Sequence, residues 1–234
     1  MKARIIILST AFIFMYSISA FTQAEEKHDS YEKSYLRLQK YYEESVNTDK
    51  HYINGFLYAE TFPGSRGHPF FQSEIWYDAE LFMDGRHYMS LALRYDLYRD
   101  QLLYNHIHTT GSYILVLNNK LIEEFIIDGH HFSKMKEGYY ELLFEGKASF
   151  YVKWQKLLSD PTAKSVGEFS LIKEWYILNN SVFRKVSSKS GLLKALEDHR
   201  KEIKIYIREN RMVIKTGNES EVKHILEYYN HLGP

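Results

Sequence analysis

The densest stretch of side chains that could bind a ligand is Arg94-Tyr-Asp-Leu-Tyr-Arg-Asp100. Side chains alternate between the two faces of a strand, so an extended chain places Arg94, Asp96, Tyr98 and Asp100 on one face. One interpretation is a polar row that faces a ligand, with Arg94 holding an anion. The alternative is a structural Arg94–Asp96 network at a sheet end, with Asp100 in a turn, and this is the more common case.

A pair of histidines, His106 and His108, has the spacing that puts two imidazoles on one strand face. Imidazole binds Zn, Cu, Ni and Fe, and His87, His130 or His131 could supply further ligands. A protein zinc site commonly uses three or four ligands, so two histidines alone indicate a metal site only weakly. The alternative is a solvated strand face.

Motifs for other chemistry are missing from the sequence. It has no cysteine, which excludes disulfides, thiolate metal sites and a cysteine nucleophile. It has no serine in a G-x-S-x-G turn, and Gly64-Ser-Arg-Gly67 lacks the ending of a phosphate-binding loop. We therefore expect no cofactor. A metal-dependent or glycan-acting enzyme is the last of our functional hypotheses.

Aromatic residues are abundant, with 20 tyrosines, 14 phenylalanines and 3 tryptophans. Such rings can line a groove for a sugar, a peptide or a lipid. The alternative is packing in the core and on the sheet faces, because strands are rich in aromatic residues. The candidate groove residues are Phe70, Phe71 and Trp76, together with Tyr58, Phe62, Tyr77, Trp154, Trp175 and Tyr176.

The N-terminal residues 1–24 have the layout of a cleavable secretory signal. Lys2 and Arg4 precede an apolar run, and Thr22-Gln-Ala24 provides small residues for cleavage. The alternative is that this segment is retained as a membrane anchor. No later stretch of the sequence approaches the about 20 apolar residues of a membrane helix. We expect export to the periplasm or the outer membrane, with secretion as the alternative, and no transmembrane segment after signal cleavage.

The remaining chain, 25–234, is predicted to form one α+β domain. A helix is expected at 29–46, a β-rich region at 53–187 and amphipathic helices in a tail at 188–231. Asp84-Gly85 and Asp128-Gly129 are typical hairpin turns. The spacing of strands and turns predicts a curved antiparallel meander of eight to ten strands. The strands are expected at 73–83, 87–98, 101–108, 113–117, 121–127, 139–144, 148–157, 168–178 and 182–186.

Four features of the sequence together form a recognisable pattern: Gly67-His-Pro-Phe-Phe71, Trp76, Leu93-Arg-Tyr-Asp-Leu-Tyr-Arg-Asp-Gln-Leu102 and Gly138-Tyr-Tyr-Glu-Leu-Leu-Phe-Glu-Gly146. With them, the chain resembles a family of uncharacterised exported envelope proteins of Bacteroidetes. The resemblance implies an envelope location in a Gram-negative bacterium. It carries over no functional residue.

Charge narrows the choice of partner. Lysine and arginine total 30, aspartate and glutamate also total 30, and no basic block is present, so we expect no nucleic-acid binding.

Our leading hypothesis is a non-enzymatic protein that binds another envelope component, and we expect this component to be a protein. The alternative is a carrier or sensor of an apolar ligand such as a lipid, and a glycan ligand also fits the aromatic residues. A carrier requires a cavity, whereas an interaction module requires a filled core and exposed rings.

Overall fold

The computed structural model of the chain describes residues 51–59, 62–108, 111–135, 137–161 and 166–233. The chain divides into two units, residues 1–50 and residues 51–234, and the description concerns the second unit. The expected secretory signal at 1–24 and the expected helix at 29–46 lie outside the described residues.

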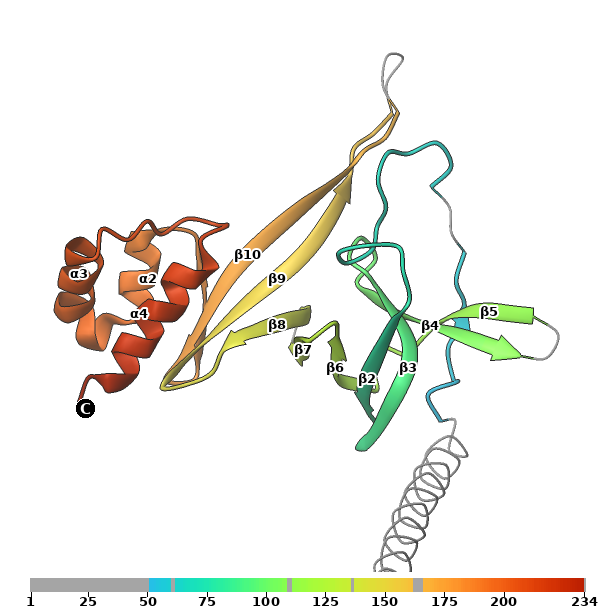
Figure 1. Cartoon of the computed structure of the whole chain (residues 1–234), viewed down its shortest axis with the longest axis horizontal. Helices are drawn as coiled ribbons and strands as arrows, with labels where there is room; N and C mark the ends of the chain where they lie inside the picture. Colours follow the sequence, from blue (N-terminus) through green and yellow to red (C-terminus); the bar gives the residue numbers. More distant parts are fainter. Residues whose placement is uncertain (1–50, 60–61, 109–110, 136, 162–165, 234) are drawn as a thin grey trace, which may run out of the picture. The chain divides into compact units, whose positions relative to one another are not determined.

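The second unit has an α+β fold that is built on a curved, mostly meandering antiparallel sheet (Figure 1). In the described part of the chain this sheet has eleven strands, in the order β1-β5-β4-β3-β2-β6-β7-β8-β9-β10-β11. The strands are β1 (Phe56–Leu57), β2 (Tyr77–Met83), β3 (Arg86–Asp96), β4 (Gln101–His108), β5 (Gly111–Val116), β6 (Ile122–Ile127), β7 (His130–Met135), β8 (Gly138–Phe144), β9 (Ala148–Leu158), β10 (Phe169–Asn179) and β11 (Val182–Val186).

The predicted meander is confirmed, although two of the eleven strands were not expected. The first is β1, whose two residues are too few for a periodic pattern. The second is β7, which carries two histidines and a lysine where β-branched residues are typical. β2 pairs with both β3 and β6, so the meander runs in opposite directions from this central strand.

Three hairpin turns follow from residues that tolerate a left-handed backbone. Asp84-Gly85 has φ values of 54° and 68°, and Asp128-Gly129 has 50° and 74°, as primed hairpin turns require. The third turn is Asn180-Ser181, and β10 extends one residue beyond the strand end expected at 178. Asn179 stays in β10 because its buried amide donates to the Ala195 carbonyl at 3.0 Å.

The first half of the sheet packs on itself around aromatic rings. Phe125 and Phe132 stack with centroids 4.9 Å apart, Tyr95 meets both of them edge-on, and Tyr139 meets Phe125 edge-on. All four rings are buried. Ring pairs of this kind add about 0.5–1.5 kcal/mol each beyond the area that they bury, so they stabilise the curved sheet from within.

The C-terminal tail forms the predicted amphipathic helices and packs on β8–β11. Ser188 caps α2 by accepting a hydrogen bond from the Gly191 amide at 3.3 Å. The tail comprises α2 (Lys189–Ala195), the 3₁₀ helix η1 (Glu197–His199), α3 (Arg200–Glu209) and α4 (Glu219–His231). One face of α4 is buried, as an amphipathic helix requires, and its residues are Val222, Ile225, Leu226 and Tyr229.

The helix that begins after Ser188 is interrupted at the end of α2. Leu196, at the break, is fully buried and leaves the helical backbone conformation. Among the helices of the described residues, none combines the length and the apolar character needed to cross a membrane.

Candidate functional site

The site begins where a loop folds back onto the end of β3. Phe71 donates its amide to the Tyr95 carbonyl at 2.8 Å, and Leu97 donates to the Pro69 carbonyl at 2.9 Å. These two bonds frame an antiparallel bridge between Phe70 and Asp96. The loop is rich in glycine and proline, as expected of a segment that must turn sharply. It brings predicted site residues from two parts of the sequence together.

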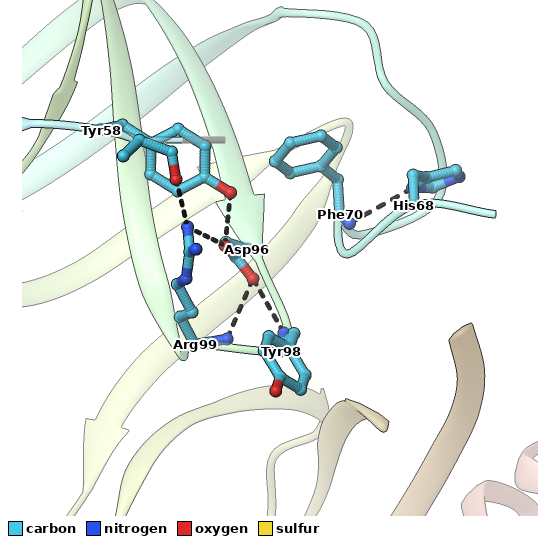
Figure 2. A network of polar contacts seen from close by, with 7 residues as sticks. Tyr58, His68, Phe70, Asp96, Tyr98 and Arg99 are labelled. Carbon is cyan, nitrogen blue, oxygen red and sulfur yellow. Dashed lines mark hydrogen bonds and ion pairs between the residues drawn. The ribbon is translucent and has the colours of Figure 1, made fainter. Parts of the chain in front are cut away.

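Asp96 is the centre of this site, and its carboxylate is completely buried. Figure 2 shows its contacts: Oδ2 accepts from the Tyr58 hydroxyl at 2.8 Å, and Oδ1 accepts from the amides of Tyr98 and Arg99 at 2.9 Å. The Arg99 guanidinium lies 3.9 Å from Oδ2 and donates to the Ala59 carbonyl. Hydrogen bonds and a nearby cation offset the cost of burying this charge.

The expected row of polar residues on one strand face is only partly correct. β3 ends at Asp96, so Tyr98 and Asp100 lie in the turn to β4 and not on the same strand face as Arg94. The turn forms because the Asp96 side chain binds the two amides that follow it, as aspartate commonly does. The Asp100 carboxylate has a different partner. It accepts a hydrogen bond from the buried Tyr95 hydroxyl at 2.5 Å.

Arg94 lies between two of the predicted aromatic site residues. Its guanidinium carbon is 4.4 Å from the centre of the Phe70 ring and 4.1 Å from that of Trp76. Cation–π contacts of this geometry contribute about 0.5–2 kcal/mol, depending on exposure. Phe70 is buried and Trp76 is partly exposed, so the stack leads from the core to the surface.

A second arginine–aromatic group continues the surface at the β3–β4 turn. Arg99 lies over the rings of Tyr58 and Phe62, at 4.9 and 4.7 Å. Phe62 in turn meets Tyr98 and Phe169 edge-on, with centroids 5.3 and 5.2 Å apart. Tyr98 is 42% exposed. We call these groups together the turn surface: Tyr58, Phe62, Phe70, Trp76, Arg94, Tyr98 and Arg99.

A pocket of about 480 Å³ adjoins the turn surface, and two ionisable side chains line it, His68 and Glu74. The Phe70 amide donates to His68 Nδ1 at 3.2 Å, and Lys156 Nζ donates to the His68 carbonyl at 2.7 Å. Burial, together with the Lys156 charge, lowers the pKa of His68, and burial lowers the pKa of Lys156 as well. The neutral imidazole is therefore favoured, with its proton on Nε2. The remaining lining residues are Phe62, Pro63, Ser65, Gly67, Pro69 and Phe169.

Two groups of predicted residues lie elsewhere. Phe71 is not a surface residue, because it is 1% exposed and its ring packs against Phe132 and Trp154 in the core. His106 lies in β4 beside the ring of Tyr104, and the side chain of His108 lies outside the described residues. Within the described residues, no three histidine or carboxylate side chains gather as metal ligands. Metal binding by this histidine pair stays a prediction.

A buried carboxylate, Glu141, forms a further polar cluster that the sequence did not reveal. Its Oε1 lies 2.5 Å from His130 Nδ1, and its Oε2 accepts from the Trp154 indole at 2.6 Å. His130 Nε2 lies 2.8 Å from the Gln72 amide, and Gln72 has a left-handed backbone with φ 51°. A carboxylate–histidine pair can serve a nucleophile, but here Gln72 occupies the position that a nucleophile would need. The cluster is therefore best explained as a connection between the loop and the sheet.

Sequence reasoning missed Arg99 of the turn surface, the residues His68 and Glu74 of the adjoining pocket, and Lys156, which binds the His68 carbonyl. Arg99 belongs to the quoted polar stretch, but nothing in the strand pattern showed that it would turn back to Asp96. The comparisons with known proteins add no information on these residues: the chain matches no protein-family model, no curated protein and no solved structure.

Proposed function

We propose that this chain is an exported, non-enzymatic binding module that recognises a protein partner through the turn surface. The observation that carries the proposal is the Arg94 stack with Phe70 and Trp76, placed beside the second stack of Arg99 on Tyr58 and Phe62. Arginine, tyrosine and tryptophan are the residues most enriched at the energetic centres of protein interfaces.

The rigidity of the turn surface supports this proposal. Asp96 fixes the turn through two backbone amides and fixes the segment that follows β1 through Tyr58. A surface that is already ordered loses less conformational entropy when a partner binds. The partly exposed rings of Trp76 and Tyr98 can therefore contact a partner at a low entropic cost.

The packing of the sheet favours an interaction module over a carrier of an apolar ligand. The faces that a carrier would leave open are filled by buried rings such as Phe125, Phe132, Phe150 and Trp175. An enzyme is less well supported as well, because catalysis needs a nucleophile, a base and stabilising donors that converge on one pocket. The pocket beside the turn surface offers a histidine and a glutamate with aromatic and proline neighbours.

Site-specific photo-cross-linking in the cell envelope tests the proposal. The photoreactive residue p-benzoylphenylalanine replaces Tyr98, which is 42% exposed, and in a control it replaces Ile205 on α3, which is 46% exposed. We expect one defined protein adduct at position 98 that is absent at position 205. Adducts of equal yield at both positions, or no protein adduct at position 98, would contradict recognition through the turn surface.

Export is a separate part of the proposal and has its own test. The proposal rests on residues 1–24, which combine basic residues, an apolar run and a small-residue end. We expect the intact mass of the protein from an envelope fraction to correspond to residues 25–234. A mass that retains the first 24 residues would mean that the segment is a membrane anchor.

A further inference from the structure

A second hollow is lined by residues of β7, β8, β10 and β11 and of the turns beside them. It has a volume of about 680 Å³, within the about 300–1,000 Å³ typical of small-molecule sites. We call it the aromatic pocket, and its lining residues are Met135, Glu137, Tyr140, Tyr176, Leu178, Ser181, Val182 and Phe183.

The aromatic pocket lies on the face of the sheet that the helical tail leaves uncovered. Trp175 and Ile177 point into the core shared with the tail helices. Tyr176 lies between them in β10, so its side chain points to the opposite face. The Tyr176 ring therefore takes no part in the core between the sheet and the tail helices.

The rings in the aromatic pocket form an ordered group. Tyr176 and Phe183 stack nearly parallel, with centroids 4.9 Å apart and an angle of 9°. Tyr140 stands perpendicular to both of them, at 5.1 and 5.3 Å. Tyr140 is 2% exposed and forms the buried side of the group, while Tyr176 and Phe183 are partly exposed. The pocket thus offers an apolar surface of fixed shape.

The polar side chains at the rim carry balanced charge. Glu174 forms an ion pair with Lys185 at 2.5 Å and accepts from the Tyr176 hydroxyl at 2.9 Å. Lys153 Nζ donates to the Glu137 carbonyl and lies 5.3 Å from the centre of the Tyr140 ring. Two acids and two bases surround the rings. A charged ligand would gain no net attraction here, whereas a neutral ligand with hydroxyl groups could bind the rim by hydrogen bonds.

We propose that the aromatic pocket binds a pyranose unit of a neutral glycan. A pyranose ring has an apolar C–H face that matches the aromatic surface, and its hydroxyl groups project from its edge toward groups such as the Glu137 carboxylate and the Ser181 hydroxyl. A lipid chain would use the rings but would make no hydrogen bond with the Glu137 carboxylate or the Ser181 hydroxyl of the lining. This inference is independent of the turn surface and of the protein partner proposed for it.

Calorimetric titration of the purified protein with three neutral hexasaccharides, namely maltohexaose, cellohexaose and chitohexaose, tests the inference. The test variant is Phe183→Leu, which keeps an apolar side chain in β11 but removes the ring. The control is Tyr228→Ala, which removes a ring that stacks on Tyr206 at 4.1 Å in the helical tail, outside the aromatic pocket. Circular dichroism establishes that each variant is folded before titration.

We expect at least one hexasaccharide to bind, Phe183→Leu to weaken that binding about tenfold or more, and Tyr228→Ala to leave it unchanged. Absence of binding to all three sugars by the folded protein would overturn the inference. Equal binding by wild type and Phe183→Leu would overturn it too. In a parallel titration with laurate, binding of laurate without binding of any sugar would also overturn the inference, because it would assign the pocket to an apolar ligand.

Discussion

The hydroxyl of Tyr58 donates a 2.8 Å hydrogen bond to the buried carboxylate of Asp96, which follows 38 residues later in the chain. The same carboxylate binds the amides of Tyr98 and Arg99 in the β3–β4 turn. One side chain therefore holds the segment around Tyr58, the end of β3 and the β3–β4 turn in a single arrangement. The stability of the turn surface depends on it.

Replacement of Asp96 by alanine is expected to destabilise the protein by about 3 kcal/mol. The variant leaves the Tyr58 hydroxyl and the turn amides without their acceptor, and it removes the charge beside Arg99. Asp96→Asn is expected to cost less, because the asparagine oxygen can still accept from both amides. Urea denaturation of the two variants measures the difference, and an equal loss in both would mean that the charge dominates over the turn hydrogen bonds.

The partly buried carboxyl of Asp100 should make the free energy of unfolding depend on pH. Burial raises the pKa of its carboxyl above the ordinary value of 3.8. The folded state then binds the proton more tightly than the unfolded state, so this group stabilises less as the pH rises from about 3.8 through the raised pKa. Asp100→Asn cannot ionise, and asparagine suits the left-handed φ of 54° at this position.

The measurement is the free energy of unfolding of wild type and Asp100→Asn across that pH range. We expect the variant to gain stability relative to wild type as the pH rises, because only the wild type has to bury an ionised carboxylate. The Tyr95 hydroxyl keeps an oxygen acceptor in both proteins. A difference that stays constant or falls with pH would refute the role of this carboxyl.

Gly138 and Gly217 form a matched pair for testing a close contact. Both have a left-handed backbone, with φ of 103° and 100°. An added Cβ at Gly138 would lie 1.9 Å from Asp100 Oδ2, whereas at Gly217 nothing lies within 4 Å. Gly217→Ala should cost about 1–2 kcal/mol from the backbone alone. We expect Gly138→Ala to cost clearly more in the same thermal denaturation, since Asp100 must also move, and equal losses would exclude the contact.

The fold was predictable where local chemistry decides it. Aspartate–glycine pairs define two hairpins, and the spacing of Val222, Ile225 and Tyr229 defines one face of α4. β7 was not predicted because its two histidines give it little strand character, although Phe132 in its centre is fully buried. Its place is determined by β6 and β8 on either side, which is information that no local pattern contains.

The candidate site was predictable as a set of residues but not as an arrangement. Arg94, Phe70 and Trp76 were all selected from the sequence, and the structure brings them together. The bridge that does so, between Phe70 and Asp96, joins residues far apart in the chain. Strand alternation also failed beyond Asp96, because its side chain binds the following amides and ends the strand.

Glu141 gives the last prediction, because it connects the Phe71 loop to the sheet through His130 and Trp154. Replacing this buried carboxylate by leucine leaves the indole N–H of Trp154 and His130 Nδ1 without their acceptor. We expect a loss of about 3 kcal/mol in stability, measured by urea denaturation. In proton NMR, the indole N–H resonance of Trp154 should move upfield in Glu141→Leu. The indole of Trp175 donates to Glu219 at 3.3 Å and serves as the internal control, because its environment stays unchanged. If both indole resonances shift equally, the variant has disturbed the whole fold, and the local role of Glu141 is refuted.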